Sequence, residues 1–365
     1  MSRPTSGPPP LKRMIVPALF VGALFLLVFL RQPNGPDLLD QWVLSGRTMG
    51  TAFTVKVVVP PGLAVGQDDV EAAIRDAVDT VDLTMSTYRE DSELGAFNRH
   101  GTEPFGVSDS MIEVVSEAQR IAGLSAGAFD ITVGPLVDAW GFGPEPVEDP
   151  PDADAIAALL AENGFQMLEV DPAGRTLQKD SAALRCDLSA IAKGYAVDRV
   201  VLGLSGLGLG DFMVEIGGEV RAVGRNAAGE AWRIGIELPE SGRAGLWSTV
   251  ALVDAAMATS GDYRNYYERN GVRLSHTIDP RTGRPVSHRL ASVSVIHASC
   301  MTADALATAI NVLGPHDGRK MVEREGLAAL FLVRTDDGGF DQWVSDAWPV
   351  ENIEGLTDVG HVESE

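Results

Sequence analysis

The stretch CDLSAIAKGYAVDRVVLGLSGLGLGDFMVEIGGEVRAVG, residues 186–224, decides the fold class. Its first half predicts a turn that opens a helix near Ser189, a plausible N-cap, and its second half predicts a strand. Gly206, Gly208 and Gly210 lie between the two and invite comparison with a dinucleotide-binding loop. They do not match G-x-G-x-x-G, and they precede a strand instead of following one. The stretch therefore predicts a helix-to-strand loop and argues against a Rossmann fold.

The rest of the chain mixes strands and helices without a regular β-α-β rhythm. Apolar residues at helical spacing, or in β-branched runs, predict these elements. Helices are predicted in residues 67–88, 109–130, 152–165 and 300–314, and strands in residues 51–59, 211–224, 232–238, 291–298 and 327–334. This mixture predicts an α+β fold rather than a doubly wound parallel sheet. Gly217 and Gly218, inside one predicted strand, indicate a bulge or a close backbone approach by a ligand.

The composition limits the kinds of partner that the chain can bind. A formal net charge of −22 over 365 residues argues against nucleic acid, because no basic face is available to neutralise phosphates. Acidity does not exclude a phosphate-bearing ligand, since a bound divalent cation can supply positive charge. Cys186 and Cys300 match no CxxC or Cys/His metal pattern. We interpret them as two buried free thiols, with a disulfide between them as the alternative.

The N-terminus indicates a targeting segment. Residues 1–13 are basic, and residues 14–31 contain an uncharged run that spans roughly 25 Å as a helix, near the lower limit for a bilayer. This order predicts a single-pass signal-anchor in the inner membrane, with the body of the protein in the periplasm. The alternative is a cleaved signal peptide and a periplasmic protein, although the run ends without a small-x-small site. We expect residues 32–45 to be a linker, 46–348 one domain and 349–365 an acidic tail.

The predicted helix CMTADALATAINVLG carries a candidate metal site. Asp304 and Thr308 are four residues apart, so they lie on one face of this helix, which we expect to end at Gly314. A carboxylate and a hydroxyl one turn apart are hard oxygen ligands of the kind that Mg²⁺ binds. The alternative is an aspartate favoured by the helix dipole, followed by an incidental threonine.

Two further segments carry candidate ligand-binding residues. Asp187 and Lys193 flank the predicted start of the helix near Ser189, where free backbone N–H groups can bind an anion. The alternative is an ordinary capped helix whose lysine extends along the surface. Tyr88, between a helix and a polar turn, is either a stacking partner for a planar ring or a core aromatic.

The segment LSHTIDPRTGRPV, residues 274–286, combines a histidine with a tight turn. Asp279 to Gly283 has the Pro and Gly positions of a turn. His276 is the one side chain of the segment that changes charge near neutral pH. Taken alone, the segment predicts a hairpin turn with a solvent-facing histidine.

Seven stretches, in order from about Thr48 to Gly314, together resemble the ApbE family of FAD:protein FMN transferases. Each stretch is weak by itself, but seven in order make a coincidence improbable. They are RTMGTAFTVKV, MSTYREDSELGAFN, GAFDITVGPLVDAWGFG, CDLSAIAKGYAVDRV, VEIGGEVRAVG, ATSGDYRNYYERNGVRLSHTIDPRTGRPV and SCMTADALATAINVLG.

The resemblance implies a T-fold-related α+β catalytic domain with mixed or antiparallel sheets. It implies that the protein binds FAD and Mg²⁺, transfers FMN to a Thr or Ser of an acceptor protein and releases AMP. The implied flavin pocket consists of Met49, Tyr88, Ala128, Phe129, Asp130, Asp187, Lys193 and Ile278. The implied metal ligands are Asp304, Thr308 and the backbone carbonyl of Ala190. The implied acceptors carry a Ser/Thr-Gly-Ala-Thr type of motif and include subunits of membrane redox complexes.

The resemblance also gives His276 and Asp279 a catalytic role. His276 is expected to lie beside the scissile bond and to take the proton of the acceptor hydroxyl, or to orient that hydroxyl. Asp279 is expected to hold the imidazole or the metal shell. Two alternative functions share the site: a Mg²⁺-dependent FAD pyrophosphatase that yields FMN and AMP, and a non-enzymatic periplasmic FAD-binding protein.

Overall fold

The computed structural model describes residues 39–349, apart from residues 144–146, 148, 241–244, 262–265 and 270–271. The expected basic N-terminus and signal-anchor lie outside the described residues, and so does the expected acidic tail beyond residue 349. Within the described part, no helix is both long and apolar enough to cross a membrane. The fold is α+β, as predicted, with antiparallel sheets and packed helices.

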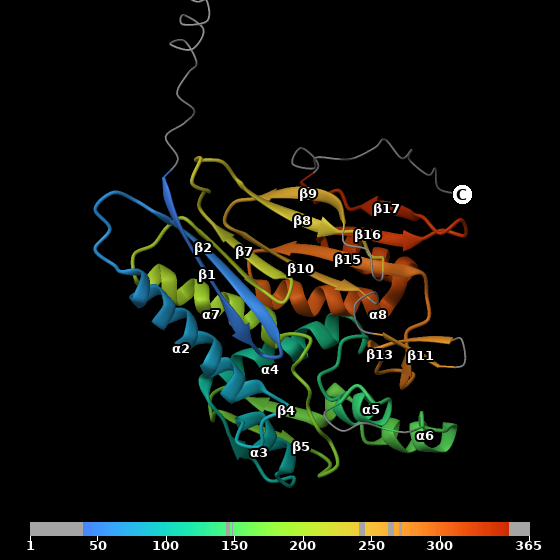
Figure 1. The fold of residues 1–365 in the computed structure, drawn as a ribbon. Coiled ribbons are helices and arrows are strands. Elements are labelled where there is room, and N and C mark those ends of the chain that lie inside the picture. The colour runs from blue at the N-terminus through green and yellow to red at the C-terminus, as the bar shows by residue number, and fades with distance from the viewer. Residues whose placement is uncertain are drawn as a thin grey trace, which may run out of the picture.

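An eight-stranded sheet forms the centre of the molecule (Figure 1), and all its neighbouring strands run antiparallel. In spatial order the strands are β1 (Asp40–Thr48), β2 (Thr51–Val59), β6 (Phe212–Ile216), β7 (Glu219–Val223), β10 (Ala255–Gly261), β15 (Leu290–His297), β16 (Ala328–Arg334) and β17 (Phe340–Val344). β1 corrects the last part of the predicted linker, from Asp40 to residue 45. The strand begins at Asp40, opposite Val59, because β2 supplies a full-length partner that local sequence does not reveal.

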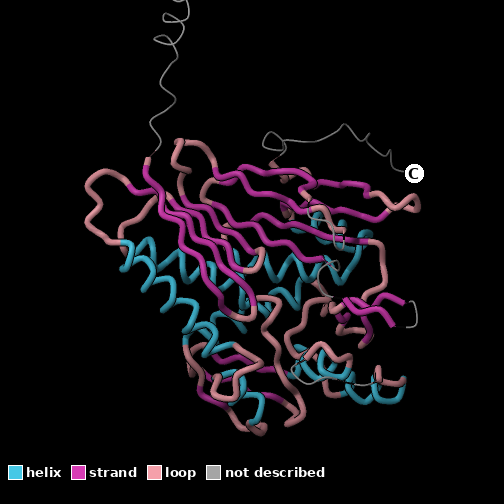
Figure 2. The backbone as a smooth tube through the Cα atoms, viewed as in Figure 1, coloured by secondary structure: helices cyan, strands magenta, loops and turns pink. Residues whose placement is uncertain are grey.

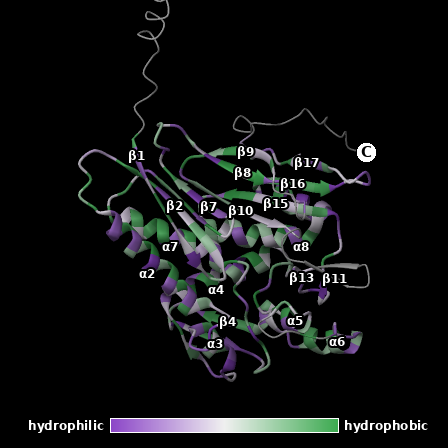
Figure 3. Ribbon diagram, in the orientation of Figure 1, coloured by the Kyte–Doolittle hydropathy of each residue, from purple (hydrophilic) through white to green (hydrophobic). Residues whose placement is uncertain are grey.

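The two faces of this sheet bury two hydrophobic cores. Helices α2 (Gln67–Met85), α4 (Asp109–Leu124), α7 (Ala192–Gly206) and α8 (Cys300–Glu325) lie on one face and enclose the larger core (Figures 1 and 2). The ribbon of β8 (Trp232–Glu237) and β9 (Leu246–Leu252) covers the other face and encloses the second core. Figure 3 shows long hydrophobic stretches in the sheet, whereas α2 is largely hydrophilic on its outer side. Because both faces of the sheet are covered, β15 is buried without interruption from Leu290 to Val295.

A smaller layer lies below the helices in Figure 1 and carries part of the cavity described below. It contains α3 (Glu93–Arg99), the strands β3 (Phe105–Gly106), β4 (Leu168–Asp171) and β5 (Thr176–Lys179), the 3₁₀ helix η1 (Phe165–Met167), and the helices α5 (Gly134–Ala139) and α6 (Ala153–Ala161). The ribbons β11 (Tyr266–Arg269) with β12 (Val272–Ser275), and β13 (Ile278–Asp279) with β14 (Arg284–Pro285), complete the fold. α5, α6 and β13 share a core of their own, built from Leu136, Trp140, Ile156 and Ile278.

Gly217 and Gly218 form a hairpin turn, which corrects the prediction of one continuous strand. Both have positive φ, 64° and 108°, and they connect β6 to β7, where Ile216 pairs with Glu219. Positive φ at both central positions of a two-residue turn suits the twist of the flanking strands. The turn sits close to Lys193, because a Cβ at Gly217 would lie 3.3 Å from the Cδ atom of that lysine.

The start of α7 also differs from the prediction, and α8, which was predicted to end at Gly314, is kinked there and continues to Glu325. α7 begins at Ala192, so Ser189 is not its N-cap. The Ser189 N–H instead donates to the Asp187 carboxylate at 2.8 Å, a local turn that competes with helix capping. In α8 the φ and ψ angles of Gly314 are 76° and −175°, which interrupts the helix just before Pro315.

α7 and α8 come into close contact at Gly194. A Cβ atom there would lie 2.3 Å from the carbonyl oxygen of Cys300 and 2.8 Å from Cα of Met301. The Gly194 N–H donates to Oδ2 of Asp304 at 3.0 Å. Glycine is therefore required for the two helices to meet, and the contact places Lys193 beside α8.

Asp198, one turn further along α7, fixes the beginning of α8. Its carboxylate accepts hydrogen bonds from the Ser299 hydroxyl at 2.8 Å and from the N–H groups of Cys300 and Met301 at 3.1 and 3.0 Å. These N–H groups belong to the first turn of α8 and have no partner within the helix. Cys300 is buried and is a free thiol, as is Cys186, which confirms the prediction for both.

Gly194→Ala is expected to lower the free energy of unfolding by about 1–3 kcal/mol, because the methyl group would overlap the Cys300 carbonyl. The matched control is Gly206→Ala on the same helix, where an added methyl group meets no atom within 4 Å. This control is expected to change the free energy by less than about 1 kcal/mol. Urea denaturation measures both values, and equal midpoints for the two variants would contradict the close contact.

Candidate active site

A cavity of about 940 Å³ lies where α7, α8 and the sheet meet the smaller layer. Its size is at the upper end of the range of about 300–1,000 Å³ that is typical of small-molecule sites. The structure brings nearly all the predicted site residues to this cavity: Tyr88, Ala128, Phe129, Asp130, Asp187, Ala190, Lys193, His276, Ile278, Asp304 and Thr308 line it. Met49 and Asp279 are the two predicted residues that are not among those lining it.

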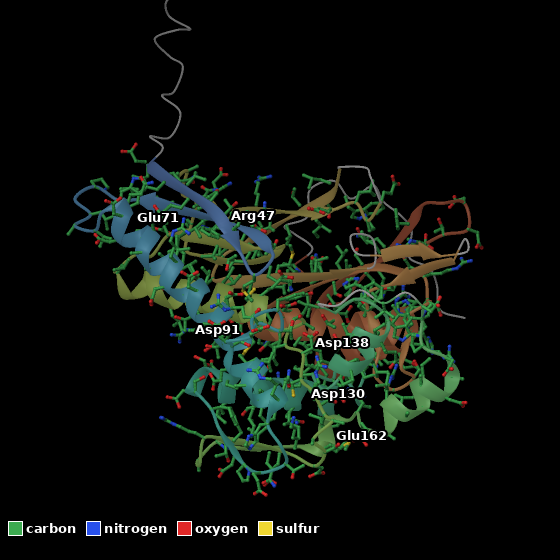
Figure 4. The ribbon with its side chains drawn as sticks, turned by 60° about the horizontal axis from the view of Figure 1, so that its bottom comes forward. Arg47, Glu71, Asp91, Asp130, Asp138 and Glu162 are labelled. Carbon is green, nitrogen blue, oxygen red and sulfur yellow. The ribbon has the colours of Figure 1, made fainter. Side chains whose placement is uncertain are left out.

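The Asp130 carboxylate is used to hold one wall of the cavity together. One of its oxygens accepts hydrogen bonds from the N–H and the hydroxyl of Thr132, at 2.8 and 2.7 Å, and the other accepts from the N–H of Phe165 at 2.7 Å. Burial raises the pKa of Asp130, although these hydrogen bonds oppose the shift. Figure 4 shows Asp130 near Asp138, below α8 and far from Arg47 on β1. We interpret Asp130 as a residue that shapes the wall.

The turn from Asp279 to Gly283, which follows His276, is held in place by hydrogen bonds from side chains of the smaller layer. The indole N–H of Trp140 donates to the Gly283 carbonyl at 2.7 Å, and the side-chain amide of Asn163 donates to the Pro280 carbonyl at 3.3 Å. The ring of Phe142 lies edge-on to that of His276, with their centroids 6.4 Å apart. The histidine is therefore part of the cavity lining, which corrects the reading of the segment alone as a solvent-facing turn.

Asp279 has a partner within the same turn. Its two carboxylate oxygens accept hydrogen bonds from Nε and Nη2 of Arg281, both at 2.9 Å. The Asp279 carbonyl also accepts from the Gly283 N–H at 2.8 Å. These contacts restrict the conformation of the turn that follows His276. The predicted role of Asp279 in holding the imidazole or the metal shell stays a prediction.

Tyr88 and Met49, two of the predicted flavin-pocket residues, differ in their surroundings. Tyr88 is 69% exposed at the cavity edge, so its alternative reading as a core aromatic is wrong. Burial of part of its ring and the nearby Asp187 raise its pKa. Met49 adopts a left-handed conformation with φ of 47° at the turn between β1 and β2. It packs against the larger core.

Lys193 lies between two buried carboxylates. Its Nζ is 3.3 Å from Oε1 of Glu219 and 3.5 Å from Oδ2 of Asp304. Glu219 and Asp304 are only 4% and 5% exposed. Burial by itself lowers the pKa of Lys193, but the carboxylates of Asp304 and Glu219 raise it well above its usual value. The lysine is therefore a permanent positive charge at the cavity wall.

Sequence reasoning missed Glu219, the first residue of β7. Burial raises its pKa to about 8, with Lys193 opposing the shift and Asp304 adding to it. Its Oε2 atom has no hydrogen-bond partner among the described residues. The only local signal was its position directly after Gly217 and Gly218, which does not reveal that the hairpin faces Lys193.

The residues around Asp304 fit a divalent cation. The described residues contain no cluster of three or more His, Cys, Asp or Glu side chains that could hold a metal. Asp304 and Thr308 line the cavity from one face of α8. Ala190, two residues before α7 begins, lines the same cavity. When Glu219 is ionised, two carboxylates surround the single ammonium of Lys193 at this corner. Hard oxygen ligands and net negative charge are what Mg²⁺ requires.

Comparison with known proteins gives the family. The sequence profile of the ApbE family matches residues 49–331. The chain belongs to the ApbE family. A FAD:protein FMN transferase of Vibrio cholerae is 46% identical over 311 residues, which cover 85% of this chain and 92% of the relative. The FAD:protein FMN transferase of Escherichia coli K12 is 39% identical over 336 residues, covering 90% and 94%.

Solved structures of ApbE proteins share this fold. The flavin transferase ApbE from Vibrio cholerae superposes with a TM-score of 0.78 at 44% identity, covering 85% of this chain and 98% of the other. The flavinyl transferase ApbE of Pseudomonas stutzeri, in its apo form, gives 0.77 at 40% identity, with 84% and 95% covered. The predicted family and its α+β fold are thus confirmed.

Trp140→Phe is expected to loosen the His276 turn. Loss of the indole donor leaves the Gly283 carbonyl without that partner, which should lower the free energy of unfolding by about 1–3 kcal/mol. Amide hydrogen exchange should accelerate at Gly283, whose N–H bonds to Asp279, and stay unchanged in the hairpin of β6 and β7. Unchanged exchange at Gly283 would show that the indole does not hold the turn.

Proposed function

We propose that this protein transfers the FMN moiety of FAD to the hydroxyl of a Thr or Ser in an acceptor protein, in a Mg²⁺-dependent reaction that releases AMP. The observation that carries the proposal is the convergence of Lys193, His276 and the Asp304–Thr308 pair on one cavity. These groups supply a positive charge, a proton acceptor and a cation site, the components that phosphoryl-type transfer needs. The enzyme class, FAD:protein FMN transferase, is that of the relatives in the same family.

His276 and Lys193 would act at the two ends of the reacting group. The acceptor hydroxyl oxygen forms a bond to the phosphorus of the FMN phosphate, and the bond from that phosphorus to the bridging oxygen breaks. AMP leaves with the bridging oxygen. His276 takes the proton of the hydroxyl, and the Lys193 ammonium offsets the negative charge of the pyrophosphate. The stiff turn below His276 keeps the imidazole in place, since about 1 Å of misplacement can cost on the order of 100-fold in rate.

The metal ligands in this proposal are Asp304, Thr308 and the backbone carbonyl of Ala190. Mg²⁺, when bound, supplies positive charge beside the pyrophosphate and orients it. The face of α8 that carries Asp304 and Thr308 also contains Met301, and the alanines beside it, Ala303, Ala305 and Ala307, are small, which would leave room for the phosphates. FAD is the flavin donor, and Mg²⁺ is the cofactor.

The flavin would lie along the opposite part of the cavity. Tyr88 offers an exposed ring for stacking on the isoalloxazine, and the wall of Ala128, Phe129 and Asp130 faces it, with Asp187 and Ile278 nearby. Met49 would contribute through the turn that precedes β2. Tyr88 has a free ring face because it projects from the connection between α2 and α3.

We also propose the cellular setting that the N-terminal sequence predicts. The catalytic domain would face the periplasm from a single-pass anchor in the inner membrane, or would be released there after cleavage. The acceptor would be a protein with a Ser/Thr-Gly-Ala-Thr type of motif, such as a subunit of a membrane redox complex. The net charge of −22 disfavours nucleic acid as a partner.

The test is intact mass spectrometry of an acceptor domain that bears Ser-Gly-Ala-Thr. The full-length protein in detergent is mixed with this domain, FAD and Mg²⁺, and a mass gain of one FMN phosphoester is expected. A Thr→Ala acceptor and added EDTA are the controls, and both should abolish the gain. AMP and free FMN without a mass gain would favour a pyrophosphatase. Bound FAD with no AMP would favour a flavin-binding protein.

His276→Ala is expected to lower the transfer rate by on the order of 100-fold or more, because the proton acceptor is lost. FAD affinity should change little, since the flavin wall and Lys193 are untouched. Stopped-flow transfer and flavin fluorescence titration measure the two quantities separately. A variant with the full transfer rate would remove His276 from the role of base.

A further inference from the structure

Glu219 presents a buried carboxylate that the proposed chemistry does not yet use. The residue lines the cavity and is only 4% exposed. Its Oε1 lies 3.3 Å from Nζ of Lys193, and its Oε2 has no hydrogen-bond partner among the described residues. An unpaired oxygen of a buried carboxylate is costly. Its presence beside a cavity points to a partner that arrives with the ligands.

Lys193 is shared between Glu219 and the proposed metal ligand Asp304. The lysine Nζ is 3.5 Å from Oδ2 of Asp304, and this same oxygen accepts the Gly194 N–H at 3.0 Å. A cation bound by Asp304 would therefore lie very close to the ammonium. Two positive charges at such a distance in a partly buried site repel strongly. The ammonium and the cation compete for one carboxylate.

We propose that Lys193 occupies the cation site intramolecularly, and that Glu219 is the positioning residue that keeps the ammonium when a divalent cation binds to Asp304. In the ligand-free protein the ammonium is shared by both carboxylates. With the cation bound, the ammonium moves fully to Glu219 and stays at the cavity wall. Lys193 would then remain at the cavity wall, available to the phosphate-bearing ligand that the cation would also bind.

The charge balance at this corner supports the exchange. With Glu219 ionised, Lys193, Glu219 and Asp304 together carry one net negative charge, and a divalent cation converts it to one net positive charge. That value suits a pyrophosphate, whose negative charge completes the neutralisation. Without the carboxylate of Glu219, the cation would join an already neutral pair of Lys193 and Asp304, which gives it little attraction.

Variants of the two side chains should shift cation affinity in opposite directions. Glu219→Gln is nearly isosteric and leaves Asp304 as the only carboxylate for Lys193, so the dissociation constant of the cation should rise about tenfold or more. Lys193→Met removes the competing ammonium, so that constant should fall about tenfold. The double variant Glu219→Gln with Lys193→Met should bind the cation more tightly than Glu219→Gln alone, since the two differ only in the ammonium.

The experiment is Mn²⁺ binding by electron paramagnetic resonance, with the full-length protein in detergent and without nucleotide. Mn²⁺ serves as the probe because it prefers the same oxygen ligands as Mg²⁺. The control is Glu71→Gln, which removes one charge from an exposed ion pair with Arg75 on α2, away from Asp130 in Figure 4. Circular dichroism melting confirms that each variant is folded.

Two results would overturn the inference. Wild-type Mn²⁺ affinity in Glu219→Gln would show that Glu219 does not serve the cation site. A double variant that binds no more tightly than Glu219→Gln would show that Lys193 does not compete. The second comparison remains informative even if Lys193→Met alone does not fold. The inference rests on the proposed function for the identity of the ligand, yet this assay uses neither FAD nor an acceptor. If FMN transfer is absent but the Mn²⁺ dissociation constants of the variants change as expected, only the proposed function is refuted.

Discussion

The close contact between α7 and α8 at Gly194 determines where the charged groups of the site lie. No side chain fits between this residue and the Cys300 carbonyl, so the helices meet backbone to backbone. The meeting brings the lysine of one helix to the aspartate of the other and lets the Gly194 N–H bind that aspartate directly. Asp198 then anchors the first turn of α8. The packing of α7 against α8 therefore sets the positions of the charged groups in the cavity. In a close-packed core, small displacements of the helices cost free energy.

Local sequence predicted the elements better than it predicted their assembly. The helical spacing of the first part of α8 and the interruption at Gly314 are local signals, whereas the continuation of α8 to Glu325 is not predicted. The strand β1 was missed, since its pairing with β2 makes it a strand. Ser189 was misread as an N-cap because a neighbouring carboxylate takes its N–H. Family resemblance located the cavity residues, but Glu219 became visible only when the hairpin of β6 and β7 was seen to face Lys193.

A strongly acidic protein that handles an anionic nucleotide has to concentrate positive charge locally. Here the carboxylates near the cavity are either committed to the fold or paired. Asp130 binds backbone N–H groups, Asp279 binds Arg281, and Asp304 and Glu219 share Lys193. These partners offset part of the negative charge that would repel phosphates, although the chain carries a formal net charge of −22. The acidity of the chain and the proposed chemistry are therefore compatible.

The order of strands in the central sheet has a consequence for how the protein reaches its native state. The sheet starts at one edge with β1 and ends at the other with β16 and β17, and α8 precedes those last two strands. The residues that line the cavity extend from Tyr88 to Val312, so they are distant from one another along the chain. Loop closure over such separations slows folding. A nascent chain that has not yet emerged as far as α8 has most of the residues that line the cavity but lacks Asp304 and Thr308, so ligand-binding competence arises only late in maturation.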